Sequence, residues 1–344
     1  RGLVGSEMCI RDSATSAGLT LLSGAAVGTV LFLGAGRVAH GQLDGAILAM
    51  MAFAALAAFE TVWSLPAAFQ YLSRTREAAR RLTEIVEQAP AVTFPSRSAS
   101  PANHGIGFEG VTFRYDRQAP DVLTNFTLRI DEGERVAVMG ATGAGKSTLV
   151  NLLVRFWDVD AGRILVGGQD IRTLSEARLR RGMAVVSQQA HLFNATLRDN
   201  LRLAGPDADD DRLWEALRKA RLDRFVSSLP LGLDTWIGEA GHHLSGGEAR
   251  RMAIAQAVLQ NAPVWLLDEP TEGLDRVTEQ QVMATLYDLT AHHTMLLITH
   301  RPVDLHHMDR IAILENGRIV EEGHHDALLA NGTYYPRLCT PFRP

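Results

Sequence analysis

A glycine-rich stretch at residues 140–147 constrains the fold more than any other part of the chain. It reads Gly-Ala-Thr-Gly-Ala-Gly-Lys-Ser and lies between the apolar segment 136–139 and the helical run 148–153. In this strand-to-helix context the pattern G-x-x-x-x-G-K-[ST] is typical of a phosphate loop, whose backbone N–H groups surround phosphate oxygens. Lys146 would reach the β and γ phosphates, and Ser147 would ligate magnesium. The predicted ligands are therefore ATP and Mg²⁺, and the other contacts are expected from Gly140, Thr142, Gly143, Ala144, Gly145 and Thr148.

Four polar side chains follow apolar strand segments further along the chain. Asp268 and Glu269 come after Val-Trp-Leu-Leu, His300 after Met-Leu-Leu-Ile-Thr, and Gln188 after Ala-Val-Val and a serine. Asp268 is expected to hold the magnesium ion, directly or through water, and Glu269 to orient or deprotonate the attacking water. His300 would contact the γ-phosphate, although a lone histidine is more often structural. Gln188 would ligate the metal and the water.

Two further elements fit nucleotide binding. Tyr115 precedes the phosphate loop and could stack on adenine, the alternative being a core or edge aromatic residue. Residues 244–248, Leu-Ser-Gly-Gly-Glu, are here named the signature segment. The amides of Ser245, Gly246 and Gly247 would form a second anion cradle at a helix N-terminus. We expect this cradle to complete the ATP site of a partner domain, so that function requires two such domains.

Two long apolar runs precede these motifs. Residues 14–36 carry no charge, and residues 45 to about 69 are interrupted only by Glu60. About 20 residues of helix cross a bilayer, so two transmembrane helices are expected; the alternative is buried helices of a soluble protein. Four arginines lie just beyond the second run and one between the runs, which predicts a cytoplasmic location for the downstream domain. Glu60 could line a substrate pathway or lie near the headgroups.

Composition excludes several classes of protein. The net charge is −5, so the basic excess of a nucleic-acid binder is missing and no nucleic-acid partner is expected. Cys9 and Cys339 are far apart in sequence, which argues against a disulfide framework or a zinc site and fits a reducing cytoplasm.

The pattern also divides the chain. Residues 1–13 show neither helical nor strand periodicity and are expected to be a non-native leader, or else a polar loop from an earlier helix. Residues 14–89 form the membrane part, and the proline- and serine-containing stretch 90–103 is a linker. Residues 104–344 alternate strands and helices, which predicts a layered α/β domain with a mostly parallel sheet. Asn316-Gly317 between two apolar runs predicts a hairpin.

The motifs, in this order across 106–338, resemble the nucleotide-binding domain of ABC transporters, and membrane helices on the N-terminal side resemble the exporter type. More narrowly, residues 189–201, 236–241 and 268–275 and the membrane stretch 45–70 look like the CydC subunits of bacterial CydDC exporters, which are associated with cytochrome bd assembly. The resemblance implies an ATPase subunit in the inner membrane, its nucleotide-binding domain in the cytoplasm, and a homologous CydD-like half-transporter as heterodimer partner. Cysteine and glutathione are the implied thiol substrates, and haem is another proposed ligand; the sequence does not choose among them.

The implied fold is two membrane α-helices, the remnant of a six-helix exporter domain, followed by an α/β P-loop NTPase domain of ABC type with a helical subdomain. The chain is thus expected to be a C-terminal fragment. Glu272 stands where many ABC domains carry serine, although CydC-like proteins share the glutamate, and Asp275 would shape the loop between two ATP sites. The alternatives are a homodimeric lipid or drug exporter, a soluble mechanical ABC ATPase, and a subunit that binds ATP but scarcely hydrolyses it.

Overall fold

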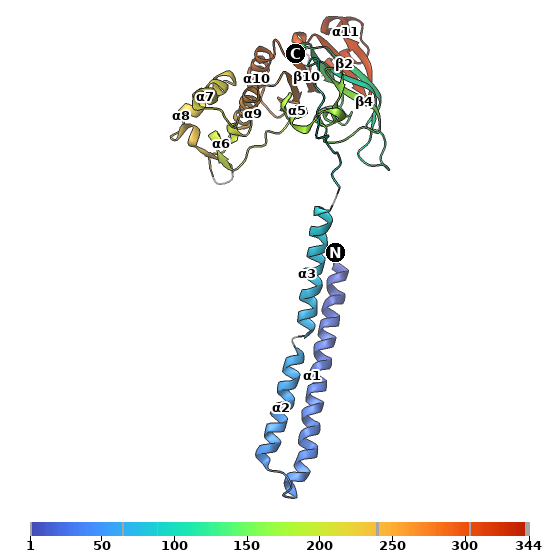
Figure 1. Cartoon of the computed structure of the whole chain (residues 1–344), viewed down its shortest axis with the longest axis vertical. Coiled ribbons are helices and arrows are strands. Elements are labelled where there is room, and N and C mark those ends of the chain that lie inside the picture. Colours follow the sequence, from blue (N-terminus) through green and yellow to red (C-terminus); the bar gives the residue numbers. More distant parts are fainter. Residues whose placement is uncertain (1, 64, 88, 239–240, 303, 341–344) are drawn as a thin grey trace. The chain divides into compact units, whose positions relative to one another are not determined.

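The structure is a computed structural model that describes residues 2–63, 65–87, 89–238, 241–302 and 304–340. The chain forms two compact units, Arg1–Ala89 and Pro90–Pro344 (Figure 1). Each unit has its own secondary structure and is described by itself. Helices are the only regular secondary structure in the described part of the first unit, and the second unit contains the sheets that carry the predicted site.

The first unit consists of α1 (Gly2–Ala39), α2 (Gly45–Trp63) and α3 (Leu65–Val86), with α1 and α2 side by side (Figure 1). Residues 2–13, which show no periodicity in the sequence, are helical in the structure rather than a loop, because α1 begins at Gly2; that residues 1–13 are a non-native leader stays a prediction. Each residue added to an existing helix gains a backbone hydrogen bond, so a helix extends through a segment of weak periodicity when no proline stops it. The second apolar helix ends at Trp63 rather than near residue 69. Pro66 falls in the first turn of α3, the position where a helix tolerates proline.

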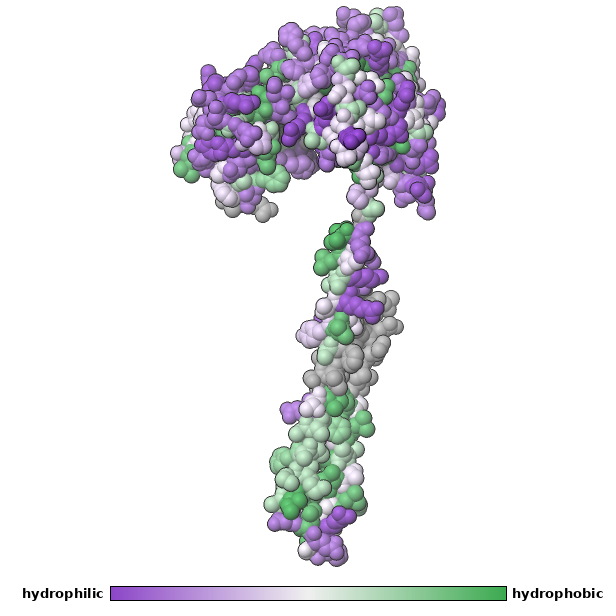
Figure 2. All heavy atoms as spheres, viewed as in Figure 1, coloured by the Kyte–Doolittle hydropathy of each residue, from purple (hydrophilic) through white to green (hydrophobic). Residues whose placement is uncertain are grey.

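Two segments of this unit are long and apolar enough to cross a membrane, Ala17–Ala39 and Gly45–Val62. Few of their side chains are buried, and Leu22, Phe32 and Phe53 are among the large apolar groups on the outside. Figure 2 shows this apolar surface continuing along the helical pair. A helix buried in a soluble core would turn such groups inward, so the arrangement favours an apolar environment around these helices.

The second unit contains a six-stranded sheet in the order β12-β11-β3-β10-β9-β6. Its strands are β3 (Arg135–Met139), β6 (Met183–Val186), β9 (Val264–Asp268), β10 (Thr294–Thr299), β11 (Arg310–Glu315) and β12 (Arg318–Gly323). All neighbours are parallel except the β11–β12 hairpin, which confirms the predicted hairpin at Asn316-Gly317. The central strands are fully buried apolar runs, as parallel strands covered on both faces require. The carboxyl ends of β3, β6, β9 and β10 consequently meet at one edge.

A second, antiparallel sheet has the order β2-β1-β4-β5, with β1 (Ile106–Phe113), β2 (Leu123–Ile130), β4 (Ala161–Val166) and β5 (Gln169–Asp170). Helices α4 (Lys146–Leu153), α5 (Glu176–Arg181), α9 (Gly246–Gln260), α10 (Arg276–Leu289), α11 (His325–Asn331) and α12 (Tyr335–Cys339) accompany the sheets. A helical subdomain contains α6 (Leu197–Arg202), α7 (Asp210–Lys219), α8 (Asp223–Ser228) and the short pair β7 (Ala195–Thr196) and β8 (Trp236–Ile237). The fold class predicted from the sequence is confirmed.

Candidate nucleotide-binding site

The phosphate loop connects β3 to α4. Gly140, Thr142, Gly143, Ala144 and Gly145 lie in this connection, and Lys146, Ser147 and Thr148 are the first residues of α4. A Cβ atom on Gly140 would stand 2.3 Å from the carbonyl oxygen of Leu314, so only glycine fits there. Gly145, which caps α4, has a φ of +97°, a conformation that side chains other than glycine rarely adopt. The sequence is therefore matched to a tight turn whose amides can face a phosphate at the start of α4.

Lys146 is buried, with 5% of its surface exposed, and is satisfied by three oxygens. Its ammonium donates to the carbonyls of Gly140 and Ala141 at 2.9 and 3.0 Å and lies 3.6 Å from Glu269 Oε1. A buried ammonium group requires such partners, because leaving water without them is costly. The predicted phosphate ligand and the predicted catalytic carboxylate are thus in one polar cluster.

The two residues predicted to hold magnesium lie next to each other. Ser147 Oγ donates to Asp268 Oδ1 at 3.0 Å, which joins the start of α4 to the end of β9. Burial raises the pKa of Asp268 above its ordinary value, and the neighbouring Glu269 carboxylate adds to this, while Ser147 and Lys146 act in the opposite direction. A hydroxyl and a carboxylate with poorly solvated charge are donors that suit Mg²⁺.

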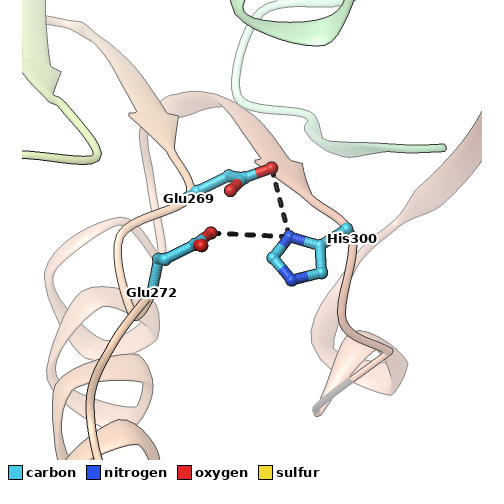
Figure 3. Close-up of side chains that lie close together, drawn as sticks. All are labelled: Glu269, Glu272 and His300. Atoms are coloured by element: carbon cyan, nitrogen blue, oxygen red, sulfur yellow. Dashed lines mark ion pairs between the residues drawn. The ribbon is translucent and has the colours of Figure 1, made fainter. Parts of the chain in front are cut away.

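Glu269 follows directly in a turn with a φ of +47°, which is uncommon for a residue with a side chain. Its amide donates to Ile298 O at 2.8 Å, and the amide of Glu272 donates to Glu269 O at 3.1 Å, closing the turn. Both carboxylates then point toward His300 (Figure 3), with Nδ1 at 3.1 Å from Glu269 Oε1 and 3.6 Å from Glu272 Oε2. The turn therefore brings Glu269 and Glu272, which are three residues apart in sequence, to the same imidazole.

These two carboxylates have opposite pKa directions. Burial alone would raise the pKa of Glu269, but the hydrogen bond with Glu272, the neighbouring His300 and the charge of Lys146 hold it below the ordinary value. The hydrogen bond with Glu269 raises the pKa of Glu272. Ligand atoms of Glu269, Glu272 and His300 lie within 4.8 Å of one another, a spacing that could also hold a cation. The ammonium of Lys146 already provides positive charge beside Glu269.

Gln188 lies in the loop after β6, and its side chain hydrogen-bonds Glu272. The guanidinium of Arg250, a buried residue of α9, donates to the backbone carbonyls of Ser187 and Gln188. Since α9 begins at the signature segment, this arginine connects that helix to the Gln188 loop. Sequence reasoning identified Gln188 but missed Arg250, which has no local pattern to mark it.

Tyr115 lies beside the phosphate loop. Its hydroxyl is 3.1 Å from Thr148 Oγ1 and accepts a longer hydrogen bond from Asn151 Nδ2. Its ring makes edge contacts with Phe113 and Trp157, at centroid distances of 4.9 and 5.6 Å, and remains partly exposed. The hydroxyl contact holds the aromatic ring next to α4, and stacking of this ring on adenine stays a prediction.

The signature segment is held mainly by its own residues. Ser245 is the N-cap of α9 and forms a capping box with Glu248, and Gly246 and Gly247 begin the helix. A Cβ on Gly247 would approach Thr278 Cγ2 to 2.9 Å, so glycine is needed for α9 to pass α10. Asp275 caps α10 by accepting from the hydroxyl of Thr278 and from the amides of Thr278 and Val277, and these hydrogen bonds, the hydroxyl's first, keep its pKa below the ordinary value. In the structure Ser245, Gly246 and Gly247 lie at the start of α9 and Asp275 at the start of α10, and not in the cluster around Lys146.

Glu279 is a further residue that the sequence did not single out. It is 1% exposed on α10, accepts from Thr271 Oγ1 at 3.0 Å, and pairs with Arg301 Nη1 at 2.9 Å. Thr271 follows Glu269 by two residues, and Arg301 follows His300. Glu279 therefore ties together the two segments that carry the predicted catalytic side chains.

Comparison with known proteins gives a consistent picture. Residues 123–272 match the family model described as ABC transporter. The chain is 43% identical over 326 residues to the glutathione/L-cysteine transport system ATP-binding/permease protein CydC of Escherichia coli K12, covering 94% of this chain and 56% of that protein. It is 37% identical over 328 residues to the ATP-dependent lipid A-core flippase of Chromobacterium violaceum, covering 95% and 56%. A solved structure of a bacterial Atm1-family ABC exporter with ATP bound aligns with a TM-score of 0.73 and 29% identity over 99% of this chain and 60% of that one.

Two candidate membrane helices followed by this nucleotide-binding fold define the class: the chain belongs to the ABC exporter family. Within the family it is similar to the CydC half-transporters, which confirms the resemblance inferred from the motifs. The CydC protein of Haemophilus influenzae Rd is also similar, with 39% identity over 85% of this chain and 51% of that protein. The chain spans about half the length of the curated relatives it matches.

Proposed function

We propose that the chain is the ATP-binding and ATP-hydrolysing permease subunit of a heterodimeric ABC exporter that moves cysteine- or glutathione-type thiols across the bacterial inner membrane, in support of cytochrome bd assembly. The observation that carries the ATPase part is the connected cluster of Lys146, Glu269 and His300 beside the Ser147–Asp268 pair. Similarity to two CydC proteins supports the thiol substrate and a CydD-like partner.

In this proposal the phosphate loop and Lys146 bind the β and γ phosphates, and Tyr115 packs on the adenine. Ser147, Asp268 and Gln188 hold Mg²⁺, which neutralises charge on the phosphates when bound. Glu269 has a lowered pKa and is ionised at neutral pH, so its Oε1 can orient the attacking water and accept its proton. His300 contacts the γ-phosphate.

Each ATP would lie between two nucleotide-binding domains, one contributing the phosphate loop and the other its signature segment. Ser245, Gly246 and Gly247 of this chain would therefore complete the site of the partner, and Asp275 would shape the α10 start between the two sites. ATP binding would clamp the domains together, and hydrolysis would release them. The membrane helices, in the bilayer of the inner membrane, would alternate their access with that cycle while the nucleotide-binding domain stays in the cytoplasm.

A homodimeric lipid or drug exporter is the second candidate. The 37% identity to a lipid A-core flippase favours it, over the same share of this chain as the CydC match. Such an exporter would need no partner of different sequence. A soluble mechanical ATPase is disfavoured by the two candidate spans with their exposed apolar side chains.

The deciding experiment is the ATPase activity of the full-length subunit with its natural partner in lipid, titrated separately with reduced glutathione, cysteine and haem. Glu269→Gln serves as the baseline. Stimulation by one thiol that disappears in Glu269→Gln would support the proposal. A flat response to all three, with stimulation by lipid A or a hydrophobic drug and assembly without a second subunit, would support the second candidate instead.

A further inference from the structure

Glu272 occupies the point where three segments of the site meet. It closes the turn after Glu269, its carboxylate lies 3.6 Å from His300 Nδ1, and it hydrogen-bonds the Gln188 side chain. The serine that many ABC domains carry here is too short to span these distances. In this chain the longer side chain gives His300 a second carboxylate neighbour, visible in Figure 3.

The imidazole has two distinct nitrogens, and a neighbour that accepts a hydrogen bond from one nitrogen fixes the role of the other. Nδ1 of His300 faces the oxygens of Glu269 and Glu272, at 3.1 and 3.6 Å. Nδ1 has no hydrogen-bond partner among the described residues, but the negative charge of the two carboxylates on this side favours the Nδ1–H tautomer and leaves Nε2 as the nitrogen available to a phosphate. With Glu269 alone this preference would depend on the same carboxylate that must also orient water.

Glu272 also connects this histidine to the signature helix. Gln188 contacts the Glu272 carboxylate through its side chain, and its backbone carbonyl is held by Arg250 of α9. The charge of Glu272 interacts favourably with the Arg250 guanidinium as well. A displacement of α9 would therefore move Gln188 and, through it, the Glu272 carboxylate.

We propose that Glu272 is a positioning residue for ATP hydrolysis: it orients His300 and couples the position of the Gln188 loop to that histidine. This rests on the proposed ATPase function. Glu272 itself need not touch ATP, and it acts through His300. Its effect should consequently appear in the turnover rate and not in nucleotide affinity.

The test uses the full exporter with its partner in lipid and measures kcat and KM for ATP. Glu272→Ser should lower kcat about tenfold and change KM by less than about twofold. Glu272→Gln keeps an oxygen that can accept from His300 Nδ1 and should retain at least about half of the wild-type kcat. Glu215→Ser, at an exposed glutamate of α7, is the matched control and should leave kcat unchanged.

A double-mutant cycle separates positioning from a structural role. If Glu272 acts through His300, Glu272→Ser/His300→Ala should be no slower than His300→Ala alone. The proposal would be overturned if Glu272→Ser had the wild-type kcat. It would also be overturned if adding Glu272→Ser to His300→Ala lowered kcat by the same factor as adding it to the wild type. Glu269→Gln distinguishes the two levels: if it hydrolyses ATP normally, the proposed function fails; if it is inactive while Glu272→Ser is normal, only the role of Glu272 fails.

Because 41% of the Glu272 side chain is exposed, truncation should leave the fold intact. The melting temperature of each variant verifies this. A lowered melting temperature in Glu272→Ser with normal kcat per folded molecule would also count against the positioning role.

Discussion

The cluster around Lys146 and the signature segment satisfy their polar groups in different ways. Ser147 and Asp268 are 121 residues apart in sequence and hydrogen-bond each other, and Lys146 pairs with Glu269 across a similar separation. In the signature segment, Ser245 bonds Glu248, three residues away. One region is therefore assembled by the tertiary fold, whereas the other is shaped by local helix capping.

This difference indicates how an ATP site can be shared between two domains. A region that depends on local capping keeps its shape at the surface, where a second molecule can meet it. A region that depends on distant strands must stay with the core that aligns them. Damage to the Lys146 cluster should thus abolish chemistry or weaken the fold, while damage to the signature segment should act on the partner's site.

The largest effect is expected at Glu269. Glu269→Gln should lower kcat by about 10³-fold, since it removes the carboxylate that accepts the proton of water, and should leave ATP binding in place. Steady-state ATPase assays and nucleotide binding by equilibrium dialysis check this. Lys146→Ala should instead weaken ATP binding, and normal turnover in Glu269→Gln would reject the role given to that carboxylate.

Glu279→Ala should have the largest effect on stability. Removing the carboxylate deletes the ion pair with Arg301 and the hydrogen bond from Thr271, which should cost about 1–3 kcal/mol because Glu279 is buried while the Arg301 side chain is 27% exposed. Urea unfolding of the nucleotide-binding domain within the full chain measures it. Glu279→Gln keeps the shape and one acceptor and should cost clearly less; equal losses in both variants would show that the stabilisation depends on the carboxylate charge and not on the shape or the remaining acceptor.

Ser245→Ala should cost only about 1 kcal/mol, the usual contribution of an N-cap hydrogen bond. ATP affinity of this chain alone should be unchanged, while ATPase activity of the assembled exporter falls. Ser175→Ala is the matched control, because Ser175 is an N-cap without a side-chain cap hydrogen bond. A Ser245→Ala exporter with full activity would contradict the expectation that this segment serves a partner's site.

The smallest expected effect is at Asp268, and it depends on pH. Its folded-state pKa is raised by burial, so its contribution to stability is complete below the unfolded pKa of about 3.9 and is lost as pH rises through the folded pKa. Asp268→Asn removes this loss and should melt above wild type at neutral pH, without Mg²⁺ or ATP. The advantage should shrink as the pH is lowered toward 4, and a constant difference across pH would count against the burial argument.

The sequence predicted those parts of the site that local pattern determines. The phosphate loop, the carboxylates after β9 and the histidine after β10 can be found because each follows an apolar strand, and parallel strands end at one edge. Glu279 and Arg250 could not be found this way. Their partners are Thr271, Arg301 and two backbone carbonyls, and only the packing of α10 and α9 brings them within reach.

The helical unit shows a similar division. The apolar composition of residues 14–36 and 45–69 was sufficient to predict two long helices, and the structure has candidate spans at Ala17–Ala39 and Gly45–Val62. The sequence did not predict where α1 begins or where α2 ends, because a helix can continue into a segment of weak periodicity. In α1, no residue before Gly41 forces the helix to stop. The turn that brings Glu272 to His300 was also beyond prediction, because it requires a left-handed conformation at Glu269 that sequence pattern does not encode.

Trp157 packs edge-on against Tyr115, the aromatic residue proposed to receive adenine, and is itself partly exposed. Indole emission is sensitive to the polarity and quenching groups around the ring, so base stacking on Tyr115 would change the fluorescence of Trp157. If adenine stacks on Tyr115 as proposed, Trp157 fluorescence would change with nucleotide occupancy, and Trp157→Phe would identify its contribution among the five tryptophans of the chain.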